Sequence, residues 1–312
     1  MTLSGLIIKS TGSWYKIRQA DASIIDARIK GKIRLKTIKT TNPVAVGDWV
    51  DYELESSGDE TYAVITQIHS RNNYMIRKSN NLSKQAQIIA SNLDLAVLVV
   101  TLSAPRTSLG FIDRFLVMAG AYHIPVCLVF NKCDLYNSDD VLHFEHLKAL
   151  YEPLGYQCLM CSTIDANYSP NSVLKSVLQH KTSLISGHSG VGKSSILNQL
   201  LPLANQKTNS ISDSHQKGKH TTTFAEMFFI DSDSALIDTP GIRDFGIIDL
   251  EKTEIGHYFP EIRAYMPQCK FNDCTHQNEP ECAVFKAFEA GQIAGSRYYN
   301  YLSILDNQDI FE

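Results

Sequence analysis

The sequence predicts a multidomain α/β protein, and three observations indicate this fold class. Short segments that alternate apolar and polar residues fill the first 80 or so positions, as expected for a small β-barrel. The middle of the chain contains continuous apolar runs that end in polar loops, which is typical of buried parallel strands. Cysteine and histidine residues cluster near the C-terminus, as in a domain held together by a metal. We expect domains at residues 1–80, 81–248 and 249–312.

Five predicted strands in the first domain indicate a barrel of the oligonucleotide-binding (OB) type. They cover residues 6–9, 14–18, 23–28, 49–54 and 63–69, and Gly, Pro, Asn and Asp turns separate them. Residues 1–84 contain 13 Lys and Arg against 8 Asp and Glu, a net charge of +5 in a chain whose net charge is −4. The first domain is therefore basic and the remainder acidic.

Aromatic and basic residues of this barrel are candidates for an RNA-binding surface, because bases stack on aromatic rings and cations attract phosphates. They are Trp14, Tyr15, Trp49 and Tyr52, together with Lys30, Lys32, Arg34 and Lys36. The alternative is a solvated basic face whose aromatic residues lie in the barrel core.

The strongest motif is Gly-x4-Gly-Lys-Ser at residues 187–194. Such a loop offers backbone N–H groups and a lysine to phosphates, and a hydroxyl to Mg²⁺. A predicted strand at 182–186 precedes it and a predicted helix at 195–201 follows it, which argues against a chance Gly-rich turn. The expected nucleotide ligands are Gly187, His188, Ser189, Gly190, Val191, Gly192, Lys193, Ser194 and Ser195, with Ser194 also a magnesium ligand.

Another predicted strand, residues 234–237, ends in Asp238-Thr239-Pro240-Gly241. In phosphoryl-transfer folds an acidic residue at this place holds Mg²⁺, and the glycine N–H contacts the γ-phosphate. Taken alone, the four residues are also compatible with an ordinary turn. Given the upstream loop, we assign Asp238 and Gly241 to the nucleotide site.

Asn131-Lys132-Cys133-Asp134 follows the apolar run 126–130, so it is expected at the C-terminal end of a parallel strand. The Asp134 carboxylate can accept the paired N–H groups on one edge of guanine, which adenine does not present, and Asp134 is therefore the predicted specificity residue. The alternative is a polar loop after a strand. No second Asn-Lys-x-Asp occurs after Gly241, where an unrotated GTPase would carry it.

The segment 161–163 follows a further predicted strand, residues 157–160. Ser162 lies in this segment and is expected to contact the base, unless the segment is a plain turn. Cys158 and Cys161 form a Cys-x-x-Cys pattern, but two cysteines in one strand are expected to be core and loop residues rather than a redox pair.

These motifs occur in a rotated order, because the guanine-recognition motif comes before the phosphate-binding loop and the Asp238 motif comes last. We therefore interpret residues 81–248 as a circularly permuted P-loop GTPase domain. Rotation preserves the fold, since the site depends on which strands are neighbours in space. In an unrotated GTPase the segment after Gly241 would be followed directly by the strand at 95–100. In this chain the two are not joined, and the segment after Gly241 leads into the next domain instead.

Residues 217–223 form a basic stretch between the phosphate-binding loop and Asp238. Thr222 is the preferred second hydroxyl ligand of Mg²⁺, although Thr221 and Thr223 are alternatives. Ile242 follows Gly241, so no glutamine is available to orient the attacking water. His220 is the preferred substitute and His188 the second choice, unless each is only a solvated loop histidine.

Catalysis would rest on positioning and on charge stabilisation by Lys193 and Asp238, with slow intrinsic turnover that a partner raises.

Cys269, Cys274, His276 and Cys282 are spaced C-x4-C-x-H-x5-C. Three thiolates and an imidazole so close together suit one tetrahedral Zn²⁺, and a site closed by four protein ligands is structural. Segments 283–292 and 295–306 are predicted helices that pack on this site.

Composition narrows the class of protein. Apolar residues make up 44% and charged residues 20% of the chain, as in soluble proteins. We find no 18-residue apolar span and no signal-peptide pattern, and seven cysteines with three in a metal pattern suit a reducing compartment. A cytoplasmic protein without a membrane partner is expected.

The motif order together with the Cys3His spacing resembles the RsgA (YjeQ/YloQ) family of circularly permuted bacterial GTPases over essentially the whole chain. The resemblance implies a factor that binds the small (30S) ribosomal subunit and its 16S rRNA late in maturation, and that hydrolyses GTP to GDP in response. It carries the nucleotide role to residues 131–134 and 187–195, and the zinc role to the Cys3His set. His188 is a departure, because the family loop usually has Gln there. We expect a monomer.

Two alternatives stay open at this point. The chain could be an RNA-binding assembly factor that uses the nucleotide only as a switch, which the missing glutamine favours. It could also be a GTPase with a protein or membrane target other than the ribosome.

Overall fold

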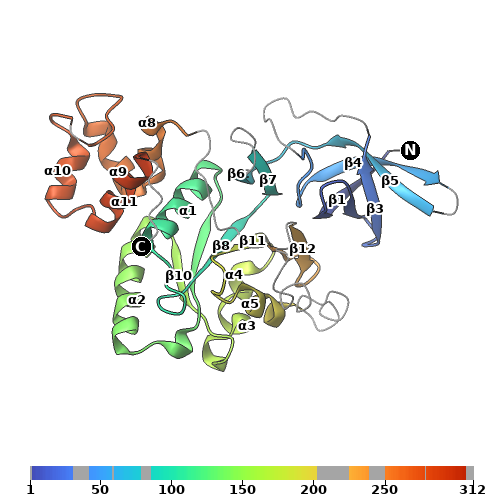
Figure 1. Cartoon of the computed structure of the whole chain (residues 1–312), viewed down its shortest axis with the longest axis horizontal. Coiled ribbons are helices and arrows are strands. Elements are labelled where there is room, and N and C mark those ends of the chain that lie inside the picture. The colour runs from blue at the N-terminus through green and yellow to red at the C-terminus, as the bar shows by residue number, and fades with distance from the viewer. Residues whose placement is uncertain are drawn as a thin grey trace.

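The computed structural model describes residues 2–30, 42–57, 60–78, 86–201, 225–238, 250–277 and 279–306. Three parts follow one another in space, as Figure 1 shows: a barrel at one end, an α/β unit in the middle and a group of helices at the other end. This arrangement confirms the predicted fold class.

The N-terminal strands close into a barrel. They are β1 (Leu3–Ser10), β2 (Tyr15–Arg18), β3 (Ile24–Ile29), β4 (Trp49–Ser57) and β5 (Glu60–Ile68). The neighbours run β1-β2-β3-β5-β4, and β4 pairs back onto β1, which closes the ring. Inward-facing side chains such as Ile7, Ile17 and Ile65 are completely buried. The alternating pattern of the sequence therefore places a five-stranded OB-type barrel here.

The four aromatic residues proposed for stacking divide into two groups. Trp14 is 49% exposed and Trp49 50% exposed, so both rings are accessible. Tyr15 is 2% and Tyr52 1% exposed, and both belong to the barrel core. The expectation was therefore wrong for the two tyrosines, which alternate inward along their strands. Of the basic residues, Lys30 is described, whereas Lys32, Arg34 and Lys36 lie outside the described residues.

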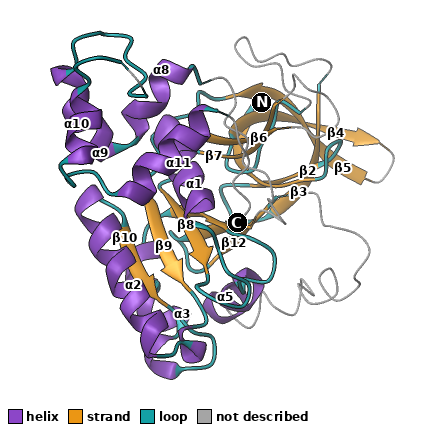
Figure 2. Ribbon diagram, turned by 60° about the vertical axis from the view of Figure 1, so that its left-hand side comes forward, coloured by secondary structure: helices purple, strands orange, loops and turns teal. Residues whose placement is uncertain are grey.

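The central unit is a parallel sheet with helices on both faces (Figure 2). Its strands lie in the order β10-β9-β8-β11-β13, and β12 adds antiparallel to β13. In chain order the elements are β8 (Leu95–Val100), α1 (Leu109–Ala121), β9 (Val126–Phe130), η1 (Cys133–Leu135), α2 (Ser138–Tyr151), η2 (Glu152–Leu154), β10 (Gln157–Met160), η3 (Ala166–Tyr168), α3 (Pro170–Val173), α4 (Lys175–Leu178), β11 (Thr182–Ser186), α5 (Lys193–Leu200), β12 (Glu226–Phe229) and β13 (Ala235–Asp238).

Alternate side chains of β8 face the two layers. Ala96 and Leu98 pack with α1 and α2, whereas Val97 and Val99 pack with α4 and α5. Because both faces are covered, the strand reads as a continuous apolar run.

Two strands that the sequence did not reveal join the barrel to the central sheet. β6 (Tyr74–Lys78) pairs antiparallel with β7 (Ala86–Ser91), and the expected domain boundary at residue 80 falls between them. An ion pair behind this hairpin is buried: Arg71 Nη2 lies 2.6 Å from Asp48 Oδ2, and Ser91 Oγ donates to Asp48 Oδ1 at 2.6 Å. The hairpin, the barrel and the start of the central unit therefore share one polar core.

The barrel and the central sheet also share hydrogen-bonded strands. β1 pairs antiparallel with β12 at Lys9 and Glu226, so that 11 of the described strands form one sheet, whereas β6 and β7 form a separate two-stranded sheet. Lys9 Nζ lies 2.9 Å from Glu226 Oε2. On its other side Glu226 pairs with Asp238 of β13. The barrel is thus one strand away from the end of β13.

The C-terminal helices are α8 (Lys252–Ile255), η4 (Gly256–Tyr258), α9 (Pro260–Tyr265), η5 (Met266–Gln268), α10 (Ala283–Glu289) and α11 (Gly295–Leu305). They share a core that includes Cys274, Cys282, Val284 and Tyr301, so the predicted packing of helices on the cysteine cluster is confirmed. Helix α10 ends three residues earlier than predicted, because Gly291 adopts a φ of +71° that stops the helix. None of the described helices is long and apolar enough to cross a membrane.

Candidate nucleotide site and metal centre

Loops from neighbouring strands meet at one edge of the central sheet. Asn131 follows β9, Cys161 follows β10 and Gly187 follows β11, and these strands are parallel. Their C-terminal ends therefore lie along the same edge, which is where open parallel sheets bind ligands.

The phosphate-binding loop depends on glycines that no other residue could replace without strain. Gly187, Gly190 and Gly192 have φ values of +143°, +85° and +98°. A Cβ on Gly187 would lie 2.2 Å from the Val99 carbonyl oxygen, and one on Gly192 would lie 2.3 Å from Asn131 Nδ2. The loop can therefore turn tightly against Val99 of β8 and against Asn131, as a phosphate-binding loop requires.

Lys193 begins helix α5 and folds back over the loop. Its Nζ donates to the Gly187 carbonyl at 2.7 Å and to the His188 carbonyl at 2.8 Å. Burial lowers the pKa of Lys193, and the nearby Asp238 carboxylate opposes that shift. The ammonium group is thus held at the loop by weak acceptors that phosphate oxygens can replace.

The hydroxyl residues of the motif lie at the start of α5 or within the loop. Ser194 is partly buried on the first turn of α5, whereas Ser189 and Ser195 are exposed. Val191 is buried beneath the loop.

The proposed base-recognition residues contact one another directly. Ser162 Oγ donates to Asp134 Oδ1 at 2.5 Å and accepts from the Ile164 and Asp165 N–H groups at 3.0 Å. The Cys133 N–H donates to the Cys161 carbonyl at 3.1 Å. Asp134 itself is exposed, so its carboxylate is oriented by Ser162 and still open to a ligand.

Asn131 and Lys132 link the two halves of the site. Buried Asn131 donates from Nδ2 to the Val191 carbonyl at 2.8 Å, which joins the base loop to the phosphate loop. Lys132 has a φ of +62° and donates from Nζ to the Ala104 carbonyl at 2.5 Å. The structure therefore brings together the residues predicted from three separate motifs.

Of the remaining predicted site residues, only Asp238 lies in the described part of the chain. Asp238 is described, partly buried at the end of β13. Thr239, Pro240, Gly241 and Ile242 lie outside the described residues, as does the whole stretch 217–223 with His220 and its threonines. Their roles remain predictions.

The structure adds a contact that sequence reasoning missed. The His188 ring lies against Phe111 of α1, with ring centroids 3.7 Å apart. The loop before α1 also reaches the site, because Pro105 lies within 3.5 Å of a Cβ placed on Gly190. The apolar strand 95–100 is the signal that could have indicated this loop, since it ends at the same sheet edge.

Cys158 and Cys161 are buried core residues, as expected. Burial raises the pKa of each thiol to about 12, so neither carries thiolate character at neutral pH.

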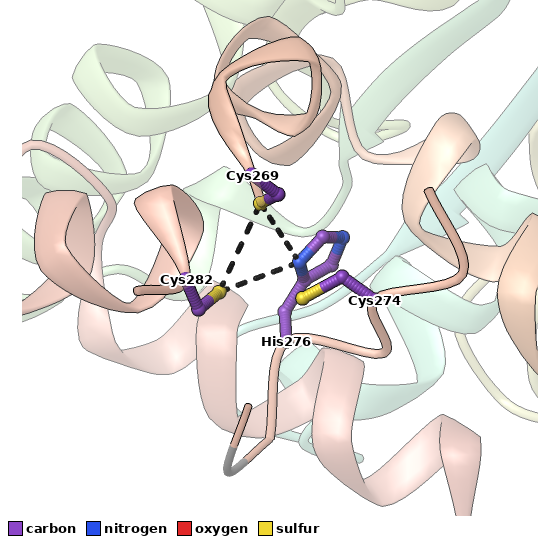
Figure 3. Close-up of side chains that lie close together, drawn as sticks. All are labelled: Cys269, Cys274, His276 and Cys282. Atoms are coloured by element: carbon purple, nitrogen blue, oxygen red, sulfur yellow. Dashed lines mark hydrogen bonds between the residues drawn. The ribbon is translucent and has the colours of Figure 1, made fainter. Parts of the chain in front are cut away.

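The four predicted metal ligands converge in the C-terminal domain (Figure 3). Their ligand atoms all lie within 4.8 Å of one another. His276 Nδ1 lies 3.6 Å from Cys269 Sγ and 3.5 Å from Cys282 Sγ, and the two sulfurs are 4.0 Å apart. A tetrahedral zinc ion with bonds of about 2.0–2.3 Å has ligand-to-ligand edges of about 3.5–3.8 Å. The donor set and its spacing therefore fit zinc.

Neighbouring groups fix the backbone between these ligands. Glu279 accepts from the Thr275 and Gln277 N–H groups at 2.6 and 2.9 Å. Tyr298 donates its hydroxyl to the His276 carbonyl at 2.7 Å. His276 has a φ of +59°, a conformation that these contacts stabilise.

Comparison with known proteins agrees with this geometry. Residues 68–248 match the profile of the RsgA GTPase domain, and residues 4–62 match that of the RsgA N-terminal domain. The chain belongs to the RsgA GTPase family. It is therefore a GTPase, whose family takes GTP and Mg²⁺.

Relatives within the RsgA family align over nearly the whole chain. The small ribosomal subunit biogenesis GTPase RsgA 2 of Bacteroides thetaiotaomicron is 50% identical over 98% of this chain and 97% of its own length. The small ribosomal subunit biogenesis GTPase RsgA of Flavobacterium psychrophilum is 48% identical over 98% of this chain and 94% of its own.

Two solved structures share the fold. YjeQ from Thermotoga maritima has a TM-score of 0.75 and 31% identity, and covers 98% of each chain. YloQ, described as a circularly permuted GTPase, has a TM-score of 0.70 and 30% identity over 98% of this chain and 95% of its own.

Proposed function

We propose that this GTPase acts in late maturation of the small ribosomal subunit in the cytoplasm, as a monomer whose GTP hydrolysis the subunit stimulates. The observation that carries the proposal is the convergence of three rotated motifs at one sheet edge, beside a basic barrel with two exposed tryptophans. The names of the curated relatives supply the small subunit as the partner. The barrel would bind 16S rRNA by stacking and phosphate contacts.

Within the nucleotide site we propose a division of labour along the sheet edge. Asp134, oriented by Ser162, would accept the guanine N–H groups. Residues 187–195 would surround the phosphates, with Lys193 on the β- and γ-phosphates. Ser194 and Thr222 would bind Mg²⁺, Asp238 would hold it through water, and Gly241 would contact the γ-phosphate.

Water positioning in this site is assigned to His220, or to His188 as second choice. Either histidine would orient the water only when the partner is bound, so we expect slow intrinsic turnover. The first domain, residues 1–80, would then bind RNA, and the second, residues 81–248, would hydrolyse GTP. The third domain, residues 249–312, would contact ribosomal RNA together with the first.

We also propose one structural Zn²⁺, held by Cys269, Cys274, His276 and Cys282. Burial raises the pKa of the Cys274 thiol to about 12, and a bound cation would offset that cost by stabilising the thiolate. Metal analysis should find about one equivalent in the wild type and almost none in Cys274→Ala. A folded wild-type protein without zinc would contradict this assignment.

Nucleotide specificity offers a direct test of the base site. Asn at position 134 would present an N–H group where Asp accepts one, and it would therefore pair with xanthine, which has a carbonyl in place of the guanine amino group. Asp134→Asn should lose GTP turnover by about 10²–10⁴-fold and gain turnover of XTP. Asp139→Asn, an exposed aspartate on the neighbouring helix, is the matched control.

The partner is tested in the same assay by adding purified 30S subunits. A steep rise in wild-type GTP turnover, with no rise for ATP, is expected. Turnover that is indifferent to subunits would keep the GTPase and remove the proposed partner. GTP binding without any turnover, with or without subunits, would favour the alternative in which the nucleotide serves only as a switch. Ile242, at the position of the missing glutamine, is the feature that suggests this alternative.

A further inference from the structure

Helix α1 is shared between the central sheet and the C-terminal domain. Ile112, Phe115 and Leu116 pack on the sheet with α2, whereas Val117 belongs to the core of the C-terminal helices. Gly120 lies against the Tyr258 ring, since a Cβ placed there would be 3.5 Å from it. A displacement of the C-terminal domain must therefore act on α1.

A buried ionic cluster lies at the centre of this shared surface. Asp113 of α1 is 0% exposed and Arg297 of α11 is 1% exposed, and Arg297 Nη1 lies 2.5 Å from Asp113 Oδ1. Asn300 Nδ2 donates to Asp113 Oδ2 at 2.5 Å, and Tyr151 donates its hydroxyl to Oδ1 at 2.8 Å. Arg297 Nε also donates to Glu261 of α9 at 2.6 Å.

Through this cluster, α2 of the central unit and α9 and α11 of the C-terminal domain are linked to the Asp113 carboxylate of α1. Although desolvation by burial lowers the pKa of Arg297, the Asp113 and Glu261 carboxylates outweigh it and raise that pKa above its ordinary value. Hydrogen-bonded buried charges have few alternative arrangements, so the cluster fixes the register between α1 and α11 closely.

The first turn of α1 also contacts the nucleotide loops. Phe111, two residues before Asp113, packs against the His188 ring of the phosphate-binding loop, with the two ring planes tilted by 32°. The segment leading into α1 carries the Ala104 carbonyl that accepts from Lys132 and the Pro105 ring beside Gly190. One rigid helix therefore connects the ionic cluster to both the phosphate loop and the base loop.

We propose that the Asp113–Arg297–Glu261 cluster couples the C-terminal domain to the nucleotide site, with α1 as the connecting element and His188 as the residue it positions. Asp113 and Arg297 are positioning residues in this scheme, because neither reaches the nucleotide loops itself. The inference rests on the GTPase activity but not on the ribosomal partner, so intrinsic turnover is sufficient to test it.

A double-mutant cycle on GDP affinity and GTP turnover tests the coupling. One arm, the neutral-cluster variant, replaces both members of the fully buried pair with Asp113→Asn and Arg297→Gln, so that neither of these two charges is left alone, while Glu261 keeps the 10% exposure of its side chain. The other arm is His188→Ala. The fold-changes that two distant, independent substitutions cause multiply to within about twofold when the substitutions are combined. If α1 couples the two sites, the combined variant should depart from the product of the two separate fold-changes by about threefold or more. A multiplicative result would overturn the proposal.

The His188 ring protons give a readout that a purely structural role would not change. Stacking on Phe111 should shift these protons upfield, and Phe111→Leu calibrates the full effect. The neutral-cluster variant should lose a measurable part of that shift, whereas Tyr299→Ala, an exposed change on the same α11 (61% exposed), should lose none. An unchanged His188 shift in a folded, zinc-loaded neutral-cluster variant would refute the coupling.

Glu261→Gln keeps the Asp113–Arg297 pair and replaces the double variant if that variant does not fold. It should shift the His188 protons in the same direction by a smaller amount, and no shift would again refute the proposal. A wild-type chain without GTP turnover would instead be a failure of the proposed enzyme, which the same assay separates from a failure of coupling.

Discussion

Two glycines with nearly the same backbone conformation allow the link between the base loop and the phosphate loop to be measured. Gly192 has a φ of +98° and Gly155 a φ of +94°. A Cβ on Gly192 would lie 2.3 Å from Asn131 Nδ2, whereas a Cβ on Gly155 would meet nothing within 4 Å. Alanine at either position costs about 1–2 kcal/mol of folding free energy for the left-handed backbone.

Only Gly192→Ala should also weaken nucleotide binding. The new methyl group must displace the Asn131 side chain and break its 2.8 Å hydrogen bond to the Val191 carbonyl. A buried hydrogen-bonding group left unsatisfied costs about 1–3 kcal/mol. We expect GDP binding to require the loop arrangement that this hydrogen bond holds, so the same free energy is lost from binding and GDP affinity falls by about 5- to 150-fold.

Fluorescent-GDP titration measures the affinity, and urea unfolding measures the stability of both variants. Gly155→Ala should unfold more easily but bind GDP as the wild type does. Equal GDP affinities for the two variants would refute the reasoning. The backbone strain that both variants share would then be sufficient to explain any change in affinity.

Three further outcomes are expected. Arg71→Met leaves Asp48 buried without its partner and should destabilise the protein by about 3–5 kcal/mol in urea unfolding, whereas Lys30→Ala, which breaks an exposed pair with Glu53, should cost at most about 1 kcal/mol. Trp14→Ala and Trp49→Ala should each weaken binding to single-stranded RNA by about 1–3 kcal/mol, while Tyr15→Phe, a core change, should leave RNA affinity unaltered. Because burial lowers the pKa of Lys193, against the opposing effect of Asp238, the free protein should lose this proton at a lower pH than an exposed lysine does. GDP affinity should then fall as the pH rises through that lowered pKa, because binding takes up a proton on Lys193. If Lys193→Met shows the same dependence of GDP affinity on pH, Lys193 is not its cause.

Four strands of the central sheet could be predicted to the residue, whereas β13 lies one residue later than the predicted 234–237 and β12 was not predicted. β8, β9, β10 and β11 agree with the predicted ranges, because each is a short apolar run that ends where a polar loop begins. The nucleotide motifs were predictable for a related reason, since phosphate loops need glycine at positive φ and few other sequences satisfy that need.

Contacts between distant segments left no local signal. β6 and β7 read Tyr-Met-Ile-Arg-Lys and Ala-Gln-Ile-Ile-Ala-Ser, which show neither a clear alternation nor a long apolar run. Asp113 and Arg297 are 184 positions apart, and a single sequence treats both as surface charges. The stacking of Phe111 on His188 depends on the angle at which α1 crosses the sheet, which periodicity does not determine.

The permutation itself explains why α1 occupies its place between the two domains. In an unrotated GTPase the segment after Gly241 would continue into β8 and from there into α1. In this chain that covalent connection is absent, and the sequence after Gly241 leads to the C-terminal domain. That domain packs back on α1 through Arg297 and Val117. Packing therefore brings the domain that follows Gly241 in the sequence back against α1, the helix from which rotation of the chain separated it.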